Sequence, residues 1–73
     1  MNYIIRLDCI AHNNPYNLKY NEQVWIKDVF GNEKKHTKSK DDAYRFMSLE
    51  RAKSIAYKIM SNHIFKPVII KTI

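Results

Sequence analysis

Few residues in this chain of 73 could do catalytic or metal chemistry, since it has three histidines, one cysteine and seven carboxylates. Cys9 and His12 have a C-x-x-H spacing, but no second Cys or His pair follows nearby, and structural zinc needs four ligands. Asp41 and Asp42 are adjacent in a polar stretch, which predicts none of the burial that a catalytic acid and base need. Gly31 is the only glycine, which excludes glycine-rich phosphate loops and a nucleophile elbow. We therefore expect no enzyme, no metal centre and no cofactor.

Basic side chains form the first candidate surface. Residues 34–40, KKHTKSK, hold four lysines, and a predicted helix further along adds three more basic side chains. These residues are Lys34, Lys35, Lys38, Lys40, Arg51, Lys53 and Lys58. They could contact several phosphates of a nucleic acid, or form only a solvated edge and loop. The chain lacks the K/R-G-F/Y signature of RNA-recognition domains, so the alternatives stay open.

Aromatic residues in a polar segment form the second candidate surface. Residues 15–20, PYNLKY, carry Tyr16 and Tyr20, and bulky groups beside a polar loop are typical anchors of protein interfaces. A structural role is an equally good reading of either tyrosine. Trp25 follows nearby, but at least one face of its predicted strand must be buried, which favours a core position for it.

Charge is unevenly distributed along the chain, whose formal net charge is +6. Residues 1–33 carry three basic and four acidic side chains, a net −1, whereas residues 34–73 carry ten basic and three acidic side chains, a net +7. Such asymmetry favours an acidic partner, either nucleic acid or the acidic face of a protein.

Length and composition indicate one small domain, residues 1–73, that folds: 45% of its residues are hydrophobic. The single cysteine excludes an intramolecular disulfide and favours a reducing, cytoplasmic location. Arg6 and Asp8 interrupt the apolar start of the chain, and no apolar run approaches about 18 residues. We therefore expect neither a signal peptide nor a membrane partner.

Several segments have strand patterns. Residues 2–10 alternate with period two, and Cys9 shares their apolar face, where a thiol acts as a small hydrophobe. Residues 23–30 are β-branched and aromatic and end at a Gly-Asn turn signal, after which residues 33–42 could begin with a lysine-rich edge strand. Residues 65–73 form a last strand, in which Pro67 suits an edge. Residues 12–22 have no sustained period and predict a long loop.

A helix is the clearest element. Ser48 is a good N-cap, and Glu50 places negative charge in the first turn. Apolar residues recur at three- and four-residue steps and form one stripe, Leu49, Ala52, Ile55, Ala56, Ile59, Met60 and His63. We expect the helix to end near residue 63, because Pro67 forbids its continuation.

Together these elements predict an α+β fold of order β-β-β-α-β, a small two-layer domain with one amphipathic helix on an antiparallel or mixed sheet. A single helix leaves one sheet face to cover, and a homodimer is one way to cover it. The apolar residues that could face away from the helix are Ile4, Ile10, Val29 and Ile69.

One segment of the chain, residues 37–59, has the sequence TKSKDDAYRFMSLERAKSIAYKI. It resembles a pattern, T-(x)n-A-x-x-F-x-S-x-E-x-A-x-x-I-A, that is common in small accessory proteins of phages and mobile elements in low-GC bacteria. The matching residues are Ala43, Phe46, Ser48, Glu50, Ala52, Ile55 and Ala56. The run from Thr37 to Ile59 covers about a third of the chain, and each matching residue is a cap or a core contact. The resemblance therefore implies a hairpin, a Ser-capped helix and a last strand, and it assigns no binding residue.

Proteins of that kind include anti-CRISPR and other host-takeover inhibitors. The resemblance thus implies a non-enzymatic protein that occludes a bacterial host protein or nucleoprotein complex. Many such inhibitors mimic nucleic acid with an acidic surface, and the net charge of +6 departs from that mode. Contact through the basic residues together with Tyr16 and Tyr20 remains open. The alternative is a small basic nucleic-acid-binding protein that uses residues 34–40.

Overall fold

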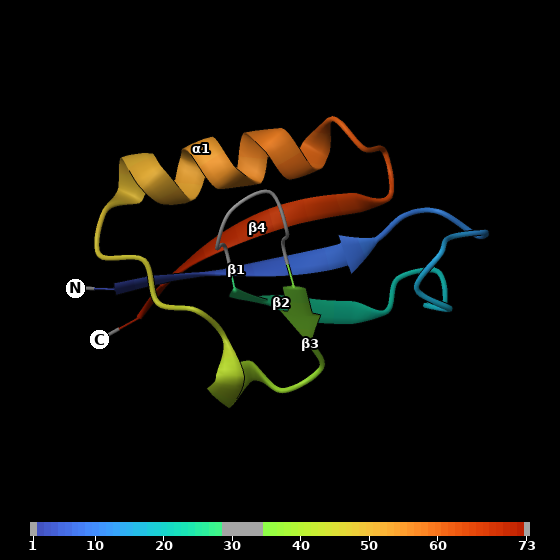
Figure 1. Ribbon diagram of the computed structural model, residues 1–73, viewed down its shortest axis with the longest axis horizontal. Coiled ribbons are helices and arrows are strands. Elements are labelled where there is room, and N and C mark those ends of the chain that lie inside the picture. Colours follow the sequence, from blue (N-terminus) through green and yellow to red (C-terminus); the bar gives the residue numbers. More distant parts are fainter. Residues whose placement is uncertain (1, 29–34, 73) are drawn as a thin grey trace.

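The computed structural model describes residues 2–28 and 35–72 and shows an α+β fold (Figure 1). Its elements follow in the predicted order β-β-β-α-β. They are β1 (Asn2–Cys9), β2 (Gln23–Asp28), β3 (Lys35–Thr37), the 3₁₀ turn η1 (Lys40–Asp42), α1 (Leu49–Met60) and β4 (Phe65–Thr72). None of the helices formed by these residues has the length and apolar character needed to cross a membrane.

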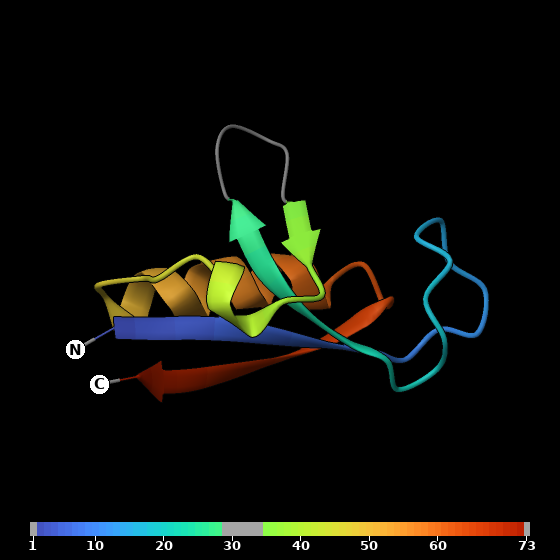
Figure 2. The same ribbon diagram turned by 90° about the horizontal axis from the view of Figure 1, so that it is seen from below.

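The strands form one antiparallel sheet with the order β3-β2-β1-β4. β1 pairs along its whole length with β4, from Asn2 opposite Thr72 to Cys9 opposite Phe65. The short β3 pairs with β2, which confirms the predicted lysine-rich edge strand. Figure 2 shows β2 and β3 turning away from the ribbon that β1 and β4 form.

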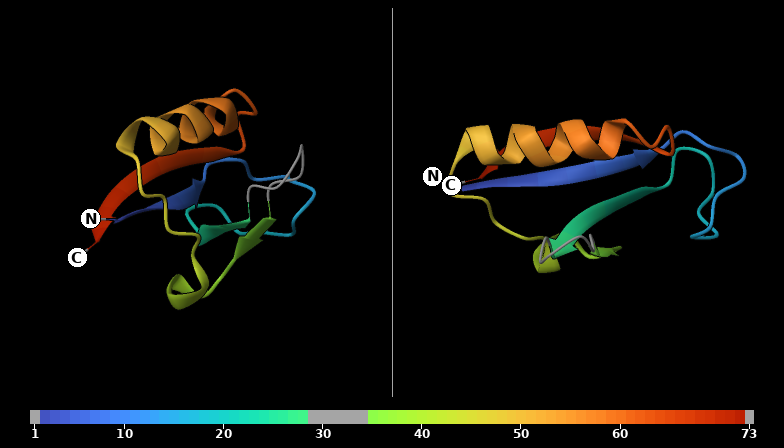
Figure 3. Two further views of the ribbon diagram at one scale, coloured as in Figure 1. Left: turned by 60° about the vertical axis from the view of Figure 1, so that its left-hand side comes forward. Right: turned by 45° about the horizontal axis from the view of Figure 1, so that its top comes forward.

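α1 covers one face of this sheet and packs on β4 and β1 (Figures 1 and 3). The period of two along β1 places Ile5, Leu7 and Cys9 on that face, and all three are buried in the core. Val24 and Ile26 of β2 join the same core. The predicted two-layer architecture, with an apolar strand face under an amphipathic helix, is therefore confirmed.

α1 begins as predicted, because the Ser48 hydroxyl accepts a hydrogen bond from the backbone N–H of Arg51 at 3.4 Å. Its buried residues are Ala52, Ile55, Ala56 and Ile59. The predicted apolar stripe is too wide, since Leu49, Met60 and His63 are exposed: a helix on two strands buries only the residues that face them. The helix ends at Met60, where the chain turns and His63 adopts a left-handed φ of 58°.

The four residues predicted to face away from the helix differ in burial and in the sheet face on which they lie. Ile4 is buried although it lies on the face opposite α1, Ile10 is exposed, and Val29 lies outside the described residues. The prediction is wrong for Ile69, which packs against the core on the helix side. Ile69 pairs with Ile5, and directly paired residues share a sheet face, so it must lie under the helix.

Adjacent substitutions in α1 test its register. Ile59 is 4% exposed, whereas Lys58 is exposed. We expect Ile59→Ala to lower the free energy of unfolding by about 2 to 5 kcal/mol, because it leaves a cavity in the core. Lys58→Ala should change it by no more than about 0.5 kcal/mol. Denaturant titration measures both values, and equal small effects would show that the helix faces the sheet differently.

Candidate binding surface

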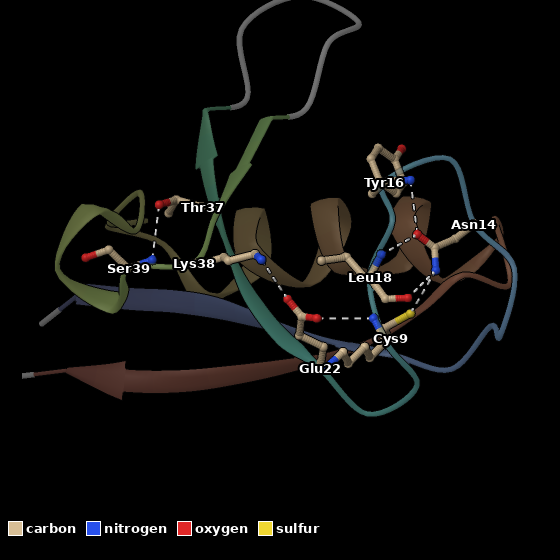
Figure 4. A network of polar contacts seen from close by, with 9 residues as sticks. Cys9, Asn14, Tyr16, Leu18, Glu22, Thr37, Lys38 and Ser39 are labelled. Carbon is tan, nitrogen blue, oxygen red and sulfur yellow. Dashed lines mark hydrogen bonds and ion pairs between the residues drawn. The ribbon is translucent and has the colours of Figure 1, made fainter.

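The loop between β1 and β2, residues 10–22, is organised around the side chain of Asn14 (Figure 4). The Asn14 amide oxygen accepts hydrogen bonds from the backbone N–H groups of Tyr16 and Leu18, at 3.0 and 3.1 Å. The amide nitrogen donates to the Leu18 carbonyl at 2.8 Å and to the Ala11 carbonyl at 3.3 Å. One side chain thus satisfies backbone groups that no strand pairs, and it fixes where Tyr16 lies.

Two further asparagines let this loop turn back. Asn17 and Asn21 have positive φ values of 56° and 67°, a region that Asn tolerates better than most residues. Leu18 points into the core and is 5% exposed. The backbone N–H of Asn21 then donates to the Cys9 carbonyl at 2.7 Å, which brings the chain back beside β1. The segment predicted as a long loop is therefore an ordered one.

Tyr16 belongs to an aromatic cluster beside the C-terminal end of α1. Its ring centroid lies 4.8 Å from that of His36 in β3, edge to face, and 5.6 Å from that of Phe65 in β4. The centroids of His36 and Phe65 are 5.9 Å apart. Such aromatic pairs contribute about 0.5 to 1.5 kcal/mol beyond burial. Tyr16 is nevertheless 44% exposed, so three elements together present one ordered, accessible ring.

A cavity of about 40 Å³ lies next to this cluster. Its lining residues are Leu7, Tyr16, Ile26, Lys35, His36, Ile59, Asn62 and Phe65. This volume has room for two or three water molecules and is far below the roughly 300 Å³ at which small-molecule sites begin. Lys35, which is exposed, contributes the positive charge at its border.

The structure separates the lysines of residues 34–40. Lys38 Nζ lies 3.1 Å from the carboxylate of Glu22 in the loop (Figure 4). Together with a hydrogen bond from the Lys19 backbone N–H, this contact holds the pKa of Glu22 below its usual value. Lys40 Nζ lies 5.6 Å from the ring centroid of Trp25. Lys34 lies outside the described residues.

The basic residues of α1 lie on two flanks of the helix. Lys53 borders a groove over β4. At 100° per residue, Arg51 and Lys58 fall on the opposite flank, the one that turns toward β2. Of the predicted basic residues, Lys35 therefore borders the cavity. Lys58 lies on the helix flank on the same side, next to the lining residue Ile59, whereas Arg51 lies on that flank near the N-terminal end of α1, away from the cavity. Lys38 and Lys40 do not join them.

Tyr20, the second predicted anchor, lies away from the cluster. Its ring stacks on that of His12, with centroids 4.6 Å apart and planes inclined by 9°, and it is 50% exposed. Cys9, the other member of the C-x-x-H pair, is buried, and its Sγ donates to the Ala11 carbonyl at 3.3 Å. Within residues 2–28 and 35–72, no three His, Cys, Asp or Glu side chains gather closely enough to hold a metal ion.

The prediction that favours the core for Trp25 is wrong. Trp25 pairs with Arg6, on the sheet face opposite α1, and it is half-buried there under Lys40. The sequence does contain a signal for this. Gln23 and Lys27 share the parity of Trp25, whereas the apolar Val24 and Ile26 have the other parity.

The surface around Tyr16, His36 and Lys35 is thus the place where an exposed aromatic ring, a concavity and positive charge come together. No protein-family model matches the chain, and neither the curated proteins nor the solved structures contain a match to it.

Asn14 and its neighbour Asn13 offer a matched test of the loop. Asn14→Ala leaves the N–H groups of Tyr16 and Leu18 without their side-chain acceptor, so it should lower the free energy of unfolding by about 1 to 3 kcal/mol. Asn13 is exposed, and Asn13→Ala should stay within about 0.5 kcal/mol. Denaturant titration compares the two variants, and equal values would refute the role given to Asn14.

His36 predicts a pH dependence of stability. Burial lowers the pKa of His36 from its ordinary 6.5, because the charged ring loses hydration in the fold. Since the folded state favours the neutral ring, the stability that His36 contributes is fully present above pH 6.5. It is lost as the pH falls from there through the lowered pKa.

Unfolding measured from pH 8 down to about pH 5 on the wild type and on His36→Gln checks this expectation. The difference between the two free energies should shrink as the pH falls below the ordinary pKa of histidine, about 6.5. A difference that is constant or grows toward low pH would contradict it. Taking the difference cancels the titration of the other histidines and of the carboxylates.

Proposed function

We propose that this chain is a non-enzymatic binding protein that attaches to an acidic surface of a bacterial host protein or nucleoprotein complex and occludes it. The observation that carries the proposal is the state of Tyr16, whose ring is accessible yet held in place by Asn14 and His36. Buried aromatic anchors concentrate the binding energy of protein interfaces. An anchor that is already ordered loses less conformational entropy on binding.

The surroundings of Tyr16 support contact with a macromolecule. The adjacent cavity of about 40 Å³ is too small for a typical substrate or cofactor. Its core-side lining, Leu7, Ile26 and Phe65, is buried, so the accessible part of this surface is the ring of Tyr16 at its border. Lys35 and the helix flank with Lys58 supply positive charge around it.

Charge supports an acidic partner and favours a protein over direct nucleic-acid binding. A phosphate-binding surface needs several cations on one face. Lys38 instead pairs with Glu22, and Lys40 covers Trp25 on the opposite face of the sheet. With a net charge of +6, complementarity would act mainly by speeding association with an acidic surface.

The phage-type role rests on the resemblance of residues 37–59 to small accessory proteins of phages, and an anti-CRISPR inhibitor is its most concrete form. The net charge of +6 opposes a nucleic-acid-mimic mode. We infer occlusion as the mode of action, because a partner surface covered by Tyr16 and its neighbours is closed to other ligands.

Tyr16→Ala tests this proposal. The partner is first isolated from a nuclease-treated bacterial lysate and then titrated with each variant. Loss of a buried aromatic anchor should weaken the complex about 30-fold, or about 2 kcal/mol. Met47→Ala is the matched control, since Met47 is 87% exposed and precedes the N-terminal cap of α1, at the opposite end from the cavity. It should leave the affinity unchanged.

Two outcomes would count against the proposal. If Tyr16→Ala bound as tightly as the wild type, the surface would be assigned wrongly. If a partner were recovered only while nucleic acid was intact, the nucleic-acid-binding alternative would be favoured instead.

A further inference from the structure

β4 is an edge strand whose outward backbone groups can be identified. The N–H of Ile10 donates to the Ile64 carbonyl at 2.8 Å, which continues the register of β1 with β4. In an antiparallel pair such bonded positions alternate. The even-numbered residues of β4 therefore bond to β1, and the N–H and C=O groups of its odd-numbered residues point outward.

The same alternation decides which side chains lie beside this open edge. The odd-numbered residues of β4 pair with the odd-numbered residues of β1, which lie under α1. Pro67 and Ile69 therefore combine outward backbone groups with side chains on the helix side. Because Pro67 has no N–H, an added strand can pair fully only toward the end of β4, at Ile69 and Lys71.

An apolar groove runs along this edge between β4 and α1. It is a wide, open hollow of about 300 Å³, lined by Lys53, Ala56, Tyr57, Met60, Pro67 and Ile69. A second hollow, of about 230 Å³, adjoins it at Tyr57 and Met60. Tyr57 is 73% exposed and Met60 52%, so the groove opens to solvent on the flank of α1 that faces away from the Tyr16 cluster.

Charge indicates what kind of segment fits this edge. Lys53 borders the groove, and Lys66 and Lys71 are exposed along β4. β4 contains no acidic residue, and the only one in α1 is Glu50 in its first turn. A second copy would bring two lysine-bordered edges together, and like charges across a strand pair are destabilising. An acidic strand meets complementary charge instead.

We propose that the open edge of β4 binds an extended acidic segment of a partner protein as an added antiparallel strand. The segment bonds to the backbone of Ile69 and Lys71, and one of its apolar side chains enters the groove beside Tyr57 and Met60. Main-chain bonds give such strand addition its affinity, and pockets for alternate side chains give it specificity. This surface is separate from the Tyr16 cluster and does not depend on the function proposed for it.

A nine-residue peptide of alternating Val and Glu, blocked at both ends, is the probe. Titrated into the full chain labelled with nitrogen-15, it should shift the amide signals of Ile69 and Lys71 and slow their hydrogen exchange. Tyr57→Ser and Lys71→Glu should each weaken binding at least five-fold. Both residues are exposed, so neither change should disturb folding. Lys58→Ala, on the other flank of α1, should bind as the wild type does.

Four results would overturn the proposal. One is an equal response to a peptide of alternating Val and Lys. Another is a response to the acidic peptide confined to Tyr16 and His36, which would assign the acidic segment to the cluster instead. Shifts at Ile69 and Lys71 on raising the protein concentration without peptide would assign the edge to a second copy. The last is the same pair of shifts when a single-stranded oligonucleotide is added, with the shifts lost in Lys71→Glu as they are for the peptide. That result would assign the edge of β4 to nucleic acid.

Discussion

The width of one helix sets the main constraint on this structure. A twelve-residue helix is about 18 Å long and 10 to 12 Å wide, whereas the axes of four strands span about 14 Å and their side chains more. α1 packs on β4 and β1, and the twist of the sheet carries β2 and β3 away from it (Figures 2 and 3). The apolar residues of β2 on the helix side must then be covered by something else. The loop of residues 10–22 contributes Leu18 to this cover, and the segment before α1 contributes Phe46. Tyr16 of the loop packs on His36 of β3.

Covering a core with a loop requires partners for the loop's own backbone groups. Asn14 supplies them for Tyr16 and Leu18, and the Glu22–Lys38 ion pair adds a second link between the loop and the segment after β3. The exposed ring of Tyr16 is a by-product of this packing, since its neighbours hold it without burying it. The same constraint acts on the other side of α1, where the helix leaves the edge of β4 open and Tyr57 and Met60 exposed. Both proposed contact surfaces thus arise where the cover provided by one helix ends.

Local patterns predicted the elements well. The alternation in residues 2–10 and the cap at Ser48 depend on neighbours in sequence, and the structure confirms both. Local patterns could not predict the hydrogen bonds that Asn14 makes to the loop backbone, because they depend on where Leu18 meets a core formed by distant strands. The position of Ile69 required the register with Ile5, which a single strand does not reveal. The outer position of Trp25 is predictable from sequence alone, since the parity of its polar neighbours Gln23 and Lys27 indicates the outer face.

Hydrogen exchange at the amides of Tyr16 and Leu18 tests most directly whether the loop of residues 10–22 is ordered and covers the sheet. Both groups donate to Asn14, and neither belongs to a strand or a helix. Their exchange should be slowed well below the rate of an unstructured peptide, and Leu18 should be the slower of the two because it is buried. Exchange of both amides at the unstructured rate, while the amides of β1 and β4 stay protected, would show that the loop does not cover the sheet. Tyr16 would then not be the ordered anchor on which the proposed function depends.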